Sequence, residues 1–253
     1  MPAKRAPHNR MLASVSGPDL WDRVAPRVDF DDWRREFSWR QGEHIGMIGP
    51  TGAGKTTLGL HLLEQRRYIT AFVTKPRDPV MEALTKKGSG FRKIIKWKSY
   101  DPNIVPKRLL WPPAEDLYAE RGQVKEFQFA LRNIYREGGW TVFVDETFYV
   151  SNVLGMDAEI RTFLTQARSL DITMMLLTQR PSRVPLEIYD QSTHLFFWQE
   201  NDERNLKTLG GISWANSALV QDLIAHLDRH ECLYVNTRRG VASMVRFTAP
   251  ERI

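Results

Sequence analysis

The segment Gly49–Thr56, which reads GPTGAGKT, constrains the fold of this chain more than any other feature. It matches the pattern G-x-x-x-x-G-K-[ST], in which glycines let the backbone curl so that successive N–H groups point inward at a phosphate. The apolar stretch His44–Ile48 precedes it, and a helical segment begins at Lys55. A loop in this position lies at the positive end of the helix dipole, which attracts anions. The segment therefore predicts a strand, a phosphate-binding loop and a helix.

The loop also predicts a ligand, ATP with Mg²⁺. We expect Lys55 to neutralise the β- and γ-phosphates, Thr56 to offer its hydroxyl to the metal, and Thr57 to reach the α-phosphate. The predicted ATP-binding residues are Gly49, Pro50, Thr51, Gly52, Ala53, Gly54, Lys55, Thr56 and Thr57. The alternative is a glycine-rich turn that joins a strand to a helix and binds nothing.

Apolar segments of strand length alternate with helical segments along most of the chain. This alternation predicts an α/β fold with a mostly parallel central sheet flanked by helices, because parallel strands need crossover connections. The predicted strands are His44–Ile48, Tyr68–Thr74, Lys93–Trp97, Thr141–Val144, Ile172–Thr178 and His194–Trp198. The predicted crossover helices are Lys55–Arg67, Val124–Arg136, Asp157–Arg168 and Asn216–Arg229. Glu231–Thr237 and Val241–Phe247, joined by Arg238-Arg239-Gly240, predict a C-terminal β-hairpin that extends the sheet.

The first 28 residues differ in composition from the rest. They are polar and contain Pro2, Pro7, Pro18 and Pro26, which exclude a long helix, so we expect an extended arm over residues 1–28. The remainder, residues 29–253, is predicted to be a single P-loop ATPase domain. With 253 residues in all, 42% of them apolar, the chain is long enough to bury one substantial core.

Charge and cysteine content limit the possible partners and compartment. The net charge of +6 suits a polyanionic partner without requiring one. The single cysteine, Cys232, excludes an internal disulfide and a cysteine-rich metal site and favours a reducing cytoplasm. No apolar stretch approaches the roughly 20 residues that cross a bilayer, so we expect no membrane association.

Two acids follow the apolar strand Thr141–Val144, namely Asp145 and Glu146. In a phosphate-loop protein this arrangement predicts that Asp145 orders the magnesium ion and that Glu146 polarises the attacking water. Alone, the two acids are equally typical of a surface loop after a core strand. The second carboxylate favours hydrolysis by water over transfer of the phosphoryl group to another acceptor.

Gln179 follows the next predicted strand, Ile172–Thr178. Ligands of open α/β sheets bind at the carboxyl ends of the strands, so its amide is placed to sense the γ-phosphate or the attacking water. The alternative is that Thr178 and Gln179 cap a loop that Pro181 ends.

Four motifs in this order resemble the HerA/FtsK branch of the additional-strand, catalytic-glutamate ATPases, which includes DNA translocases, conjugation ATPases and some viral genome-packaging ATPases. The resemblance covers about residues 38–247 and is carried by GPTGAGKTT (Gly49–Thr57), VFVDE (Val142–Glu146), QARSLDI (Gln166–Ile172) and LLTQRPSRVP (Leu176–Pro185). It implies a RecA-like core, a ring of identical subunits, either a pentamer or a hexamer, with nucleotide between neighbours, and double-stranded DNA in the central channel.

The same resemblance suggests that Arg168 is an arginine finger that reaches the γ-phosphate of a neighbouring subunit. A cation in the last turn of a helix is also stabilised by the helix dipole without any catalytic role. Arg161 and Arg180 are competing candidates for the finger.

The segment from Lys86 to Tyr100 is basic and contains no acid. Phe91 and Trp97 lie among its cations, and Gly88-Ser89-Gly90 suits a loop that follows a phosphate backbone. The candidate DNA-binding residues are Lys86, Lys87, Arg92, Lys93, Lys96 and Lys98. The alternative is a solvated charged face.

The chain leaves about 107 residues after Glu146, and these complete the sheet, so we expect no nuclease domain. This economy favours a viral DNA-packaging ATPase in the host cytoplasm, docked on a portal or procapsid. Three alternatives stay open. They are a cellular or plasmid HerA/FtsK-like translocase, a nucleotide or metabolite kinase, and a nucleotide-binding switch or scaffold.

Overall fold

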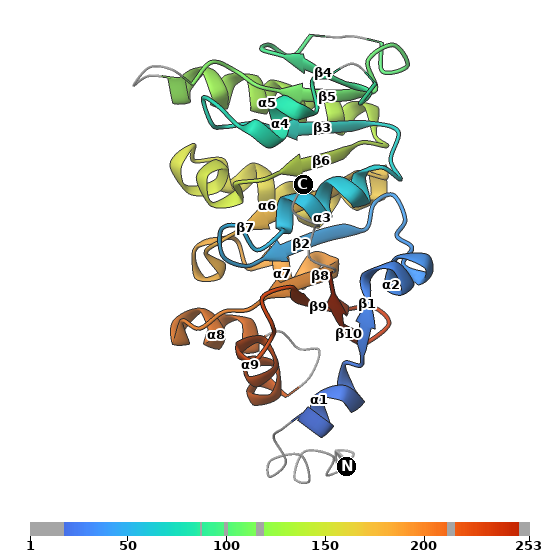
Figure 1. The fold of residues 1–253 in the computed structure, drawn as a ribbon. Coiled ribbons are helices and arrows are strands. Elements are labelled where there is room, and N and C mark those ends of the chain that lie inside the picture. Colours follow the sequence, from blue (N-terminus) through green and yellow to red (C-terminus); the bar gives the residue numbers. More distant parts are fainter. Residues whose placement is uncertain (1–17, 87, 99–100, 115–118, 212–215, 248–253) are drawn as a thin grey trace, which may run out of the picture.

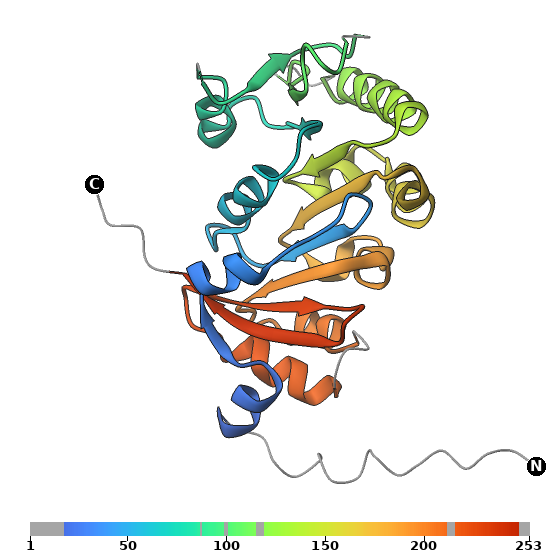
Figure 2. The same cartoon turned by 90° about the vertical axis from the view of Figure 1, so that its right-hand side faces the viewer.

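The computed structural model describes residues 18–86, 88–98, 101–114, 119–211 and 216–247. These form one large sheet with helices on both faces, as Figures 1 and 2 show. From edge to edge the strands are β1 (Arg27–Asp29), β10 (Val241–Arg246), β9 (Glu231–Asn236), β8 (Ser192–Trp198), β2 (His44–Ile48), β7 (Thr173–Thr178), β6 (Thr141–Val144), β3 (Ile69–Phe72), β5 (Lys107–Leu110) and β4 (Phe91–Ile94). Of these strands, β9 alone runs antiparallel to its neighbours. The predicted mostly parallel α/β fold with a C-terminal hairpin is confirmed.

Two apolar clusters, one on each face, bury the sheet. On β6, Val142 and Val144 enter one cluster and Phe143 the other, which explains why the strand is continuously apolar. The first cluster is covered by α1 (Pro18–Val24), α5 (Ala119–Glu137), α6 (Asp157–Gln166), α7 (Glu187–Gln191), α8 (Glu203–Gly210) and α9 (Ser217–Ala225). The second is covered by α2 (Phe30–Glu36), α3 (Lys55–Leu63) and α4 (Pro79–Ala83). Within the described residues, no helix combines the length and apolar character that spanning a bilayer requires.

The strand β5 was not predicted. A charged residue, Arg108, stands in its middle, yet its side chain is buried. The guanidinium lies 4.4 Å from the ring centre of Trp97 and 4.7 Å from that of Trp140, and its Nε donates to the Val105 carbonyl at 2.9 Å. Stacking on two indoles lets a cation occupy a position where a strand buried on both faces would otherwise carry an apolar residue. The strand predicted at Lys93–Trp97 is β4, which begins and ends earlier, at Phe91–Ile94.

Residues 18–28 differ from the expected extended arm. They form α1 and the start of β1, and Trp21 packs into the core with its indole N–H donating to Asp222 at 2.9 Å. Pro18 occupies the first turn of α1, where its missing N–H costs nothing. β1 pairs in parallel with β10, so the first and the last described strands lie together at one sheet edge. Residues 1–17 of the predicted arm lie outside the described residues.

A buried histidine at the start of β2 makes the stability of the fold sensitive to acid. The Nδ1 atom of His44 accepts the Met174 N–H at 3.0 Å and Nε2 lies 3.1 Å from the Leu164 carbonyl, so the ring is neutral. Burial lowers the pKa of His44 from 6.5 to about 4, although the hydrogen bond to Leu164 opposes the shift. Between these two values the unfolded chain binds a proton that the folded chain does not, so stability is lost as the pH falls.

We therefore expect His44 alone to lower the free energy of unfolding by about 2 kcal/mol between pH 7.5 and pH 5. Urea denaturation at the two pH values, with His44→Gln as the comparison, measures this contribution. The variant removes the titrating group, so its stability is expected to depend less on pH by that amount. Equal pH dependence of the two proteins would contradict the assignment.

Candidate active site

The loop Gly49–Gly54 connects β2 to α3 in the middle of the sheet. The Gly49 N–H donates to the Thr178 carbonyl at 3.1 Å, which ties the loop to the end of β7. A Cβ on Gly49 would stand 2.6 Å from the Cβ of Trp198, so no larger residue fits there. Gly54 has φ 103°, a conformation that side chains disfavour, just before the helix begins. The predicted loop therefore has the required position and the required glycines.

Lys55 begins α3 and folds back over the loop. Its Nζ donates to the carbonyls of Gly49 and Pro50, both at 2.7 Å. Burial lowers the pKa of Lys55 to about 8, while the charges of Asp145 and Glu146 oppose that shift. Triphosphate oxygens are stronger acceptors for an ammonium than these carbonyls and restore the stabilisation of its charge. Lys55 is thus held where its ammonium group would contact a phosphate bound by the loop.

Thr56 and Asp145 come together from α3 and the end of β6. The Thr56 hydroxyl donates to Asp145 Oδ1 at 2.6 Å. A hydroxyl and a carboxylate are hard oxygen ligands, and Mg²⁺ commonly takes one or two such protein ligands and completes its shell with water and phosphate oxygens. The pair therefore fits the predicted magnesium ion, which would replace the hydrogen bond between them.

A hydrogen-bonded chain connects the loop to the second acid. The Thr51 hydroxyl donates to Gln179 Oε1 at 2.7 Å, and Gln179 Nε2 donates to Glu146 Oε1 at 3.2 Å. These three residues come from the loop, the end of β7 and the end of β6, which lie side by side in the sheet. Glu146 and Gln179 are thus adjacent, as expected of residues that act on one water molecule.

Lys75, which follows β3, was not among the predicted site residues. Its Nζ lies 3.1 Å from Glu146 Oε1 and 3.6 Å from Asp145 Oδ2. Burial alone would lower the pKa of Lys75, but the hydrogen bond and charge of Glu146 outweigh it and raise the pKa. Because β3 pairs with β6, a polar residue after β3 meets the acids after β6. The neighbouring positions of β3 and β6 in the sheet would have predicted that Lys75 reaches these acids. Local sequence patterns do not reveal which strands are neighbours.

A cavity of about 510 Å³ opens beside Glu146 and Gln179. Gln123 lines it from α5, and its Nε2 donates to the Thr74 carbonyl at 2.9 Å. The amide oxygen of Gln123 is buried and has no hydrogen-bond partner in the part of the chain that the structure describes. Glu120 stands at the rim, 3.4 Å from the Tyr149 hydroxyl. The cavity is therefore lined by groups of both charges, the carboxylates of Glu120 and Glu146 and the cations Lys75 and Arg180.

The three candidate arginine fingers occupy different places. Arg168 lies before β7, with its backbone and Cγ against Gly42, at the end of the sheet opposite the phosphate loop. Arg161 is exposed and pairs with Asp157 and Glu187. Arg180 lines the cavity beside Glu146 in the same chain, and its guanidinium carbon lies 5.2 Å from the ring centre of Phe148. An action of Arg168 on its own copy's nucleotide is therefore excluded by position, whereas an action on a neighbour stays a prediction.

The predicted DNA-binding residues lie at and near β4, the edge strand farthest from the hairpin. Lys93 stands 3.9 Å from the ring centre of Trp111, whose indole N–H donates to the Lys75 carbonyl at 2.7 Å. Lys86, Arg92, Lys93, Lys96 and Lys98 are exposed, and Lys87 lies outside the described residues. The structure does not bring this patch to the phosphate loop.

Comparison with known proteins connects this arrangement to viral packaging ATPases. The chain is 27% identical to the DNA packaging ATPase P9 of Enterobacteria phage PRD1 over 173 aligned residues. These residues cover 67% of this chain and 69% of the P9 chain. No protein-family model matches the chain.

Two solved structures share the fold. One is the genome packaging NTPase B204 of Sulfolobus turreted icosahedral virus 2 in complex with AMPPCP (TM-score 0.58, 12% identity, 83% of this chain and 100% of that one). The other is VirB4 of Thermoanaerobacter pseudethanolicus (TM-score 0.60, 12% identity, 82% and 90%). The predicted resemblance to HerA/FtsK-type ATPases related to viral genome-packaging ATPases is confirmed.

Proposed function

From this relationship to viral genome-packaging ATPases, we propose that the chain hydrolyses ATP to drive double-stranded DNA into a viral capsid, as one subunit of a homo-oligomeric ring. The observation that carries the proposal is the hydrogen-bonded chain from Thr51 through Gln179 to Glu146, which links a phosphate loop to a carboxylate. The relationship to the P9 ATPase of PRD1 independently indicates an ATPase.

In the proposed hydrolysis, some residues of the site bind ATP and magnesium, and Glu146 accepts a proton. The loop N–H groups and Lys55 hold the β- and γ-phosphates, and Thr56 and Asp145 would hold a magnesium ion, which would neutralise charge that develops on the phosphate oxygens. Glu146 accepts the proton of the attacking water as the water oxygen bonds to the γ-phosphorus. The bond to the β-phosphate oxygen breaks, which leaves ADP and inorganic phosphate. Gln179 orients Glu146, and through it the water, by the hydrogen bond that its Nε2 donates, while its Oε1 accepts from Thr51 of the loop.

The DNA contacts are assigned to the exposed cations near β4. Contacts of lysine and arginine with phosphates carry no sequence information, which suits a motor that moves any sequence. We assign the remaining partners, a pentameric or hexameric ring of this chain and a viral portal or procapsid, on the relationship to packaging ATPases.

The proposal is tested by ATP turnover with magnesium, with and without duplex DNA of several unrelated sequences. We expect hydrolysis that rises several-fold with duplex DNA irrespective of sequence, and movement of the DNA detected by displacement of a third strand bound along the duplex. Hydrolysis that DNA leaves unchanged, but that a small-molecule acceptor accelerates, would indicate a kinase instead. Slow hydrolysis that is indifferent to DNA and to assembly would indicate a switch or scaffold.

A viral and a cellular translocase are distinguished by the docking partner. A packaging ATPase is expected to bind procapsids of its own virus in the presence of ATP and to protect DNA from nuclease inside them. DNA movement without any such protection would favour a cellular or plasmid translocase.

A further inference from the structure

A triphosphate that is bound by the loop has its two ends on opposite sides of β2. The proposed hydrolysis places the γ-phosphate beside Glu146 and Gln179, which follow β6 and β7. β7 is the neighbour of β2 on one side, and β8 is its neighbour on the other. The nucleoside, at the opposite end of the triphosphate, therefore extends toward the end of β8. Trp198 is the last residue of that strand.

Trp198 connects the phosphate loop to the C-terminal hairpin. A Cβ on Gly49 would stand 2.6 Å from the Cβ of Trp198, and one on Gly54 would stand 3.9 Å from its indole nitrogen, so the side chain lies along the loop. The indole is nearly parallel to the ring of Phe247, at an angle of 11° and with 6.4 Å between the ring centres. Because β8 and β10 both run antiparallel to β9, Phe247 lies at the same edge of the sheet as the loop.

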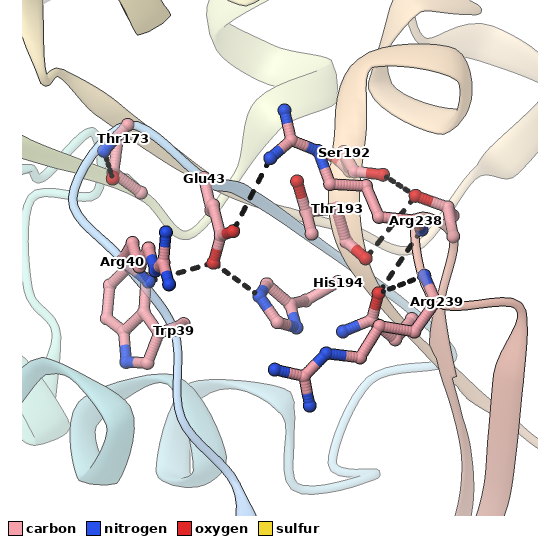
Figure 3. A network of polar contacts seen from close by, with 12 residues as sticks. Trp39, Arg40, Glu43, Thr173, Ser192, Thr193, His194, Arg238 and Arg239 are labelled. Atoms are coloured by element: carbon pink, nitrogen blue, oxygen red, sulfur yellow. Dashed lines mark hydrogen bonds and ion pairs between the residues drawn. The ribbon is translucent and has the colours of Figure 1, made fainter.

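The strand that carries Trp198 is fixed at its other end by buried polar contacts. Figure 3 shows these contacts, in which the Nε2 atom of His194 lies 3.1 Å from the carboxylate of Glu43, and the Arg238 guanidinium lies 3.7 Å from the same carboxylate. The other ring nitrogen of His194 lies 2.9 Å from the Tyr234 hydroxyl of β9. His194 and Trp198 point to the same face of β8, because side chains alternate along a strand. Trp198 is therefore held firmly, and only 2% of it is exposed.

Phe247 and Phe30 are the half-buried rings beside Trp198, and their ring centres are 5.3 Å apart. We call Trp198, Phe247 and Phe30 the aromatic wall. The only polar side-chain atom of this wall, the indole nitrogen of Trp198, is buried and has no hydrogen-bond partner within the described residues. The accessible side chains of the wall are therefore hydrocarbon rings. Such rings stabilise a nucleobase by stacking, and they tolerate different bases because every base has a π-face.

We propose that the base of the bound nucleotide stacks on Phe247, which Trp198 supports from behind, and that the site takes GTP as well as ATP. The wall contacts the face of the base and offers no side-chain hydrogen bond to its edge, so it does not distinguish one purine from another. This inference rests on the proposed ATPase function and widens the substrate class of its site to purine nucleoside triphosphates.

Truncation of the ring tests the stacking in the full chain. Phe247→Ala is expected to weaken the binding of ATP and of GTP about tenfold each, because it removes the stacked ring. Binding of inorganic tripolyphosphate, which has no base, is expected to stay unchanged, and Phe247→Tyr, which keeps a ring, is expected to bind ATP as the wild type does. Phe129→Ala, which removes an exposed ring on α5, is the matched control. Isothermal titration calorimetry with magnesium measures these affinities.

The tripolyphosphate measurement separates the base from the phosphates. If Phe247→Ala weakened tripolyphosphate as much as ATP, the ring would only support the loop, and the inference would be overturned. Unchanged ATP affinity in this variant would overturn it as well, and so would a wild type that binds ATP but not GTP. A wild type that binds neither ATP nor tripolyphosphate would contradict the proposed function itself.

Photolabelling locates the base without reference to affinity. On illumination, 8-azido-ATP attaches to residues that surround the base. Trypsin cleaves after Arg246 and Arg252, so Phe247 is released in the peptide of residues 247–252. We expect the label in this peptide, and we expect excess ATP or excess GTP to suppress it. Label that ATP suppresses but that is confined to other peptides would place the base elsewhere and overturn the inference.

Discussion

Replacing Glu146 with glutamine is expected to lower ATP turnover at least about 100-fold while ATP affinity changes by less than about threefold. A positioned general base contributes roughly 10²–10⁴ to a rate, and an amide does not accept the proton of the attacking water. The amide keeps the shape of the carboxylate and an oxygen for the hydrogen bond from Gln179, so the binding residues are not displaced. Steady-state turnover and equilibrium binding of ATP measure the two quantities separately.

The matched control is Glu203→Gln on α8, which removes an exposed carboxylate whose ion-pair partner is Lys207 and not a residue of the site. It is expected to turn over ATP at the wild-type rate. If Glu146→Gln instead lost ATP binding and kept its rate at saturating ATP, Glu146 would be a binding residue and the hydrolytic assignment would be wrong.

Replacing Lys55 with alanine is expected to weaken ATP binding at least about 100-fold. The ammonium lies 2.7 Å from two loop carbonyls, so a phosphate bound by the loop would come within its reach. Removing one partner of a buried, hydrogen-bonded charge pair costs roughly 2–5 kcal/mol. A loss of about 2.7 kcal/mol in binding free energy corresponds to a 100-fold weaker affinity. Equilibrium binding of a fluorescent ATP analogue measures the loss, and circular dichroism checks that the fold is intact.

Stability responds differently from binding in this variant. Burial already disfavours the charge of Lys55, as its lowered pKa of about 8 indicates, so its removal is expected to leave the thermal midpoint within a few degrees of the wild type. Lys207→Ala, an exposed lysine on α8, is the control for loss of a lysine. Wild-type ATP affinity in Lys55→Ala would show that the loop does not bind phosphate through this residue.

The central part of the sheet was predictable because its local patterns are strong. β2 and β6 have the predicted bounds, His44–Ile48 and Thr141–Val144, since fully buried parallel strands are short, continuous apolar runs. The edges were not predictable in the same way. β1 has three residues, too few for a pattern, and β5 contains Arg108, whose burial depends on two tryptophans from other parts of the chain.

The residues of the candidate site were also predictable only where a local sequence pattern marks them. Thr56, Asp145, Glu146 and Gln179 were recognised because each follows a buried strand or begins a helix, and the carboxyl ends of parallel strands meet at one edge. Lys75 has no such local signal. It contacts Glu146 because β3 lies beside β6, and that neighbourhood results from packing of the whole sheet.

The sequence by itself determined the phosphate loop, the two acids after β6 and the parallel character of the sheet, because these depend on residues adjacent along the chain and on short-range backbone geometry. Only the tertiary structure decided that Lys75 reaches the acids, that Gln123 and Glu120 border a cavity beside them, and that Arg238 lies near Glu43 at the far end of the sheet. These groups are separated by tens to hundreds of residues, and burial of two apolar faces and the order of the strands bring them together.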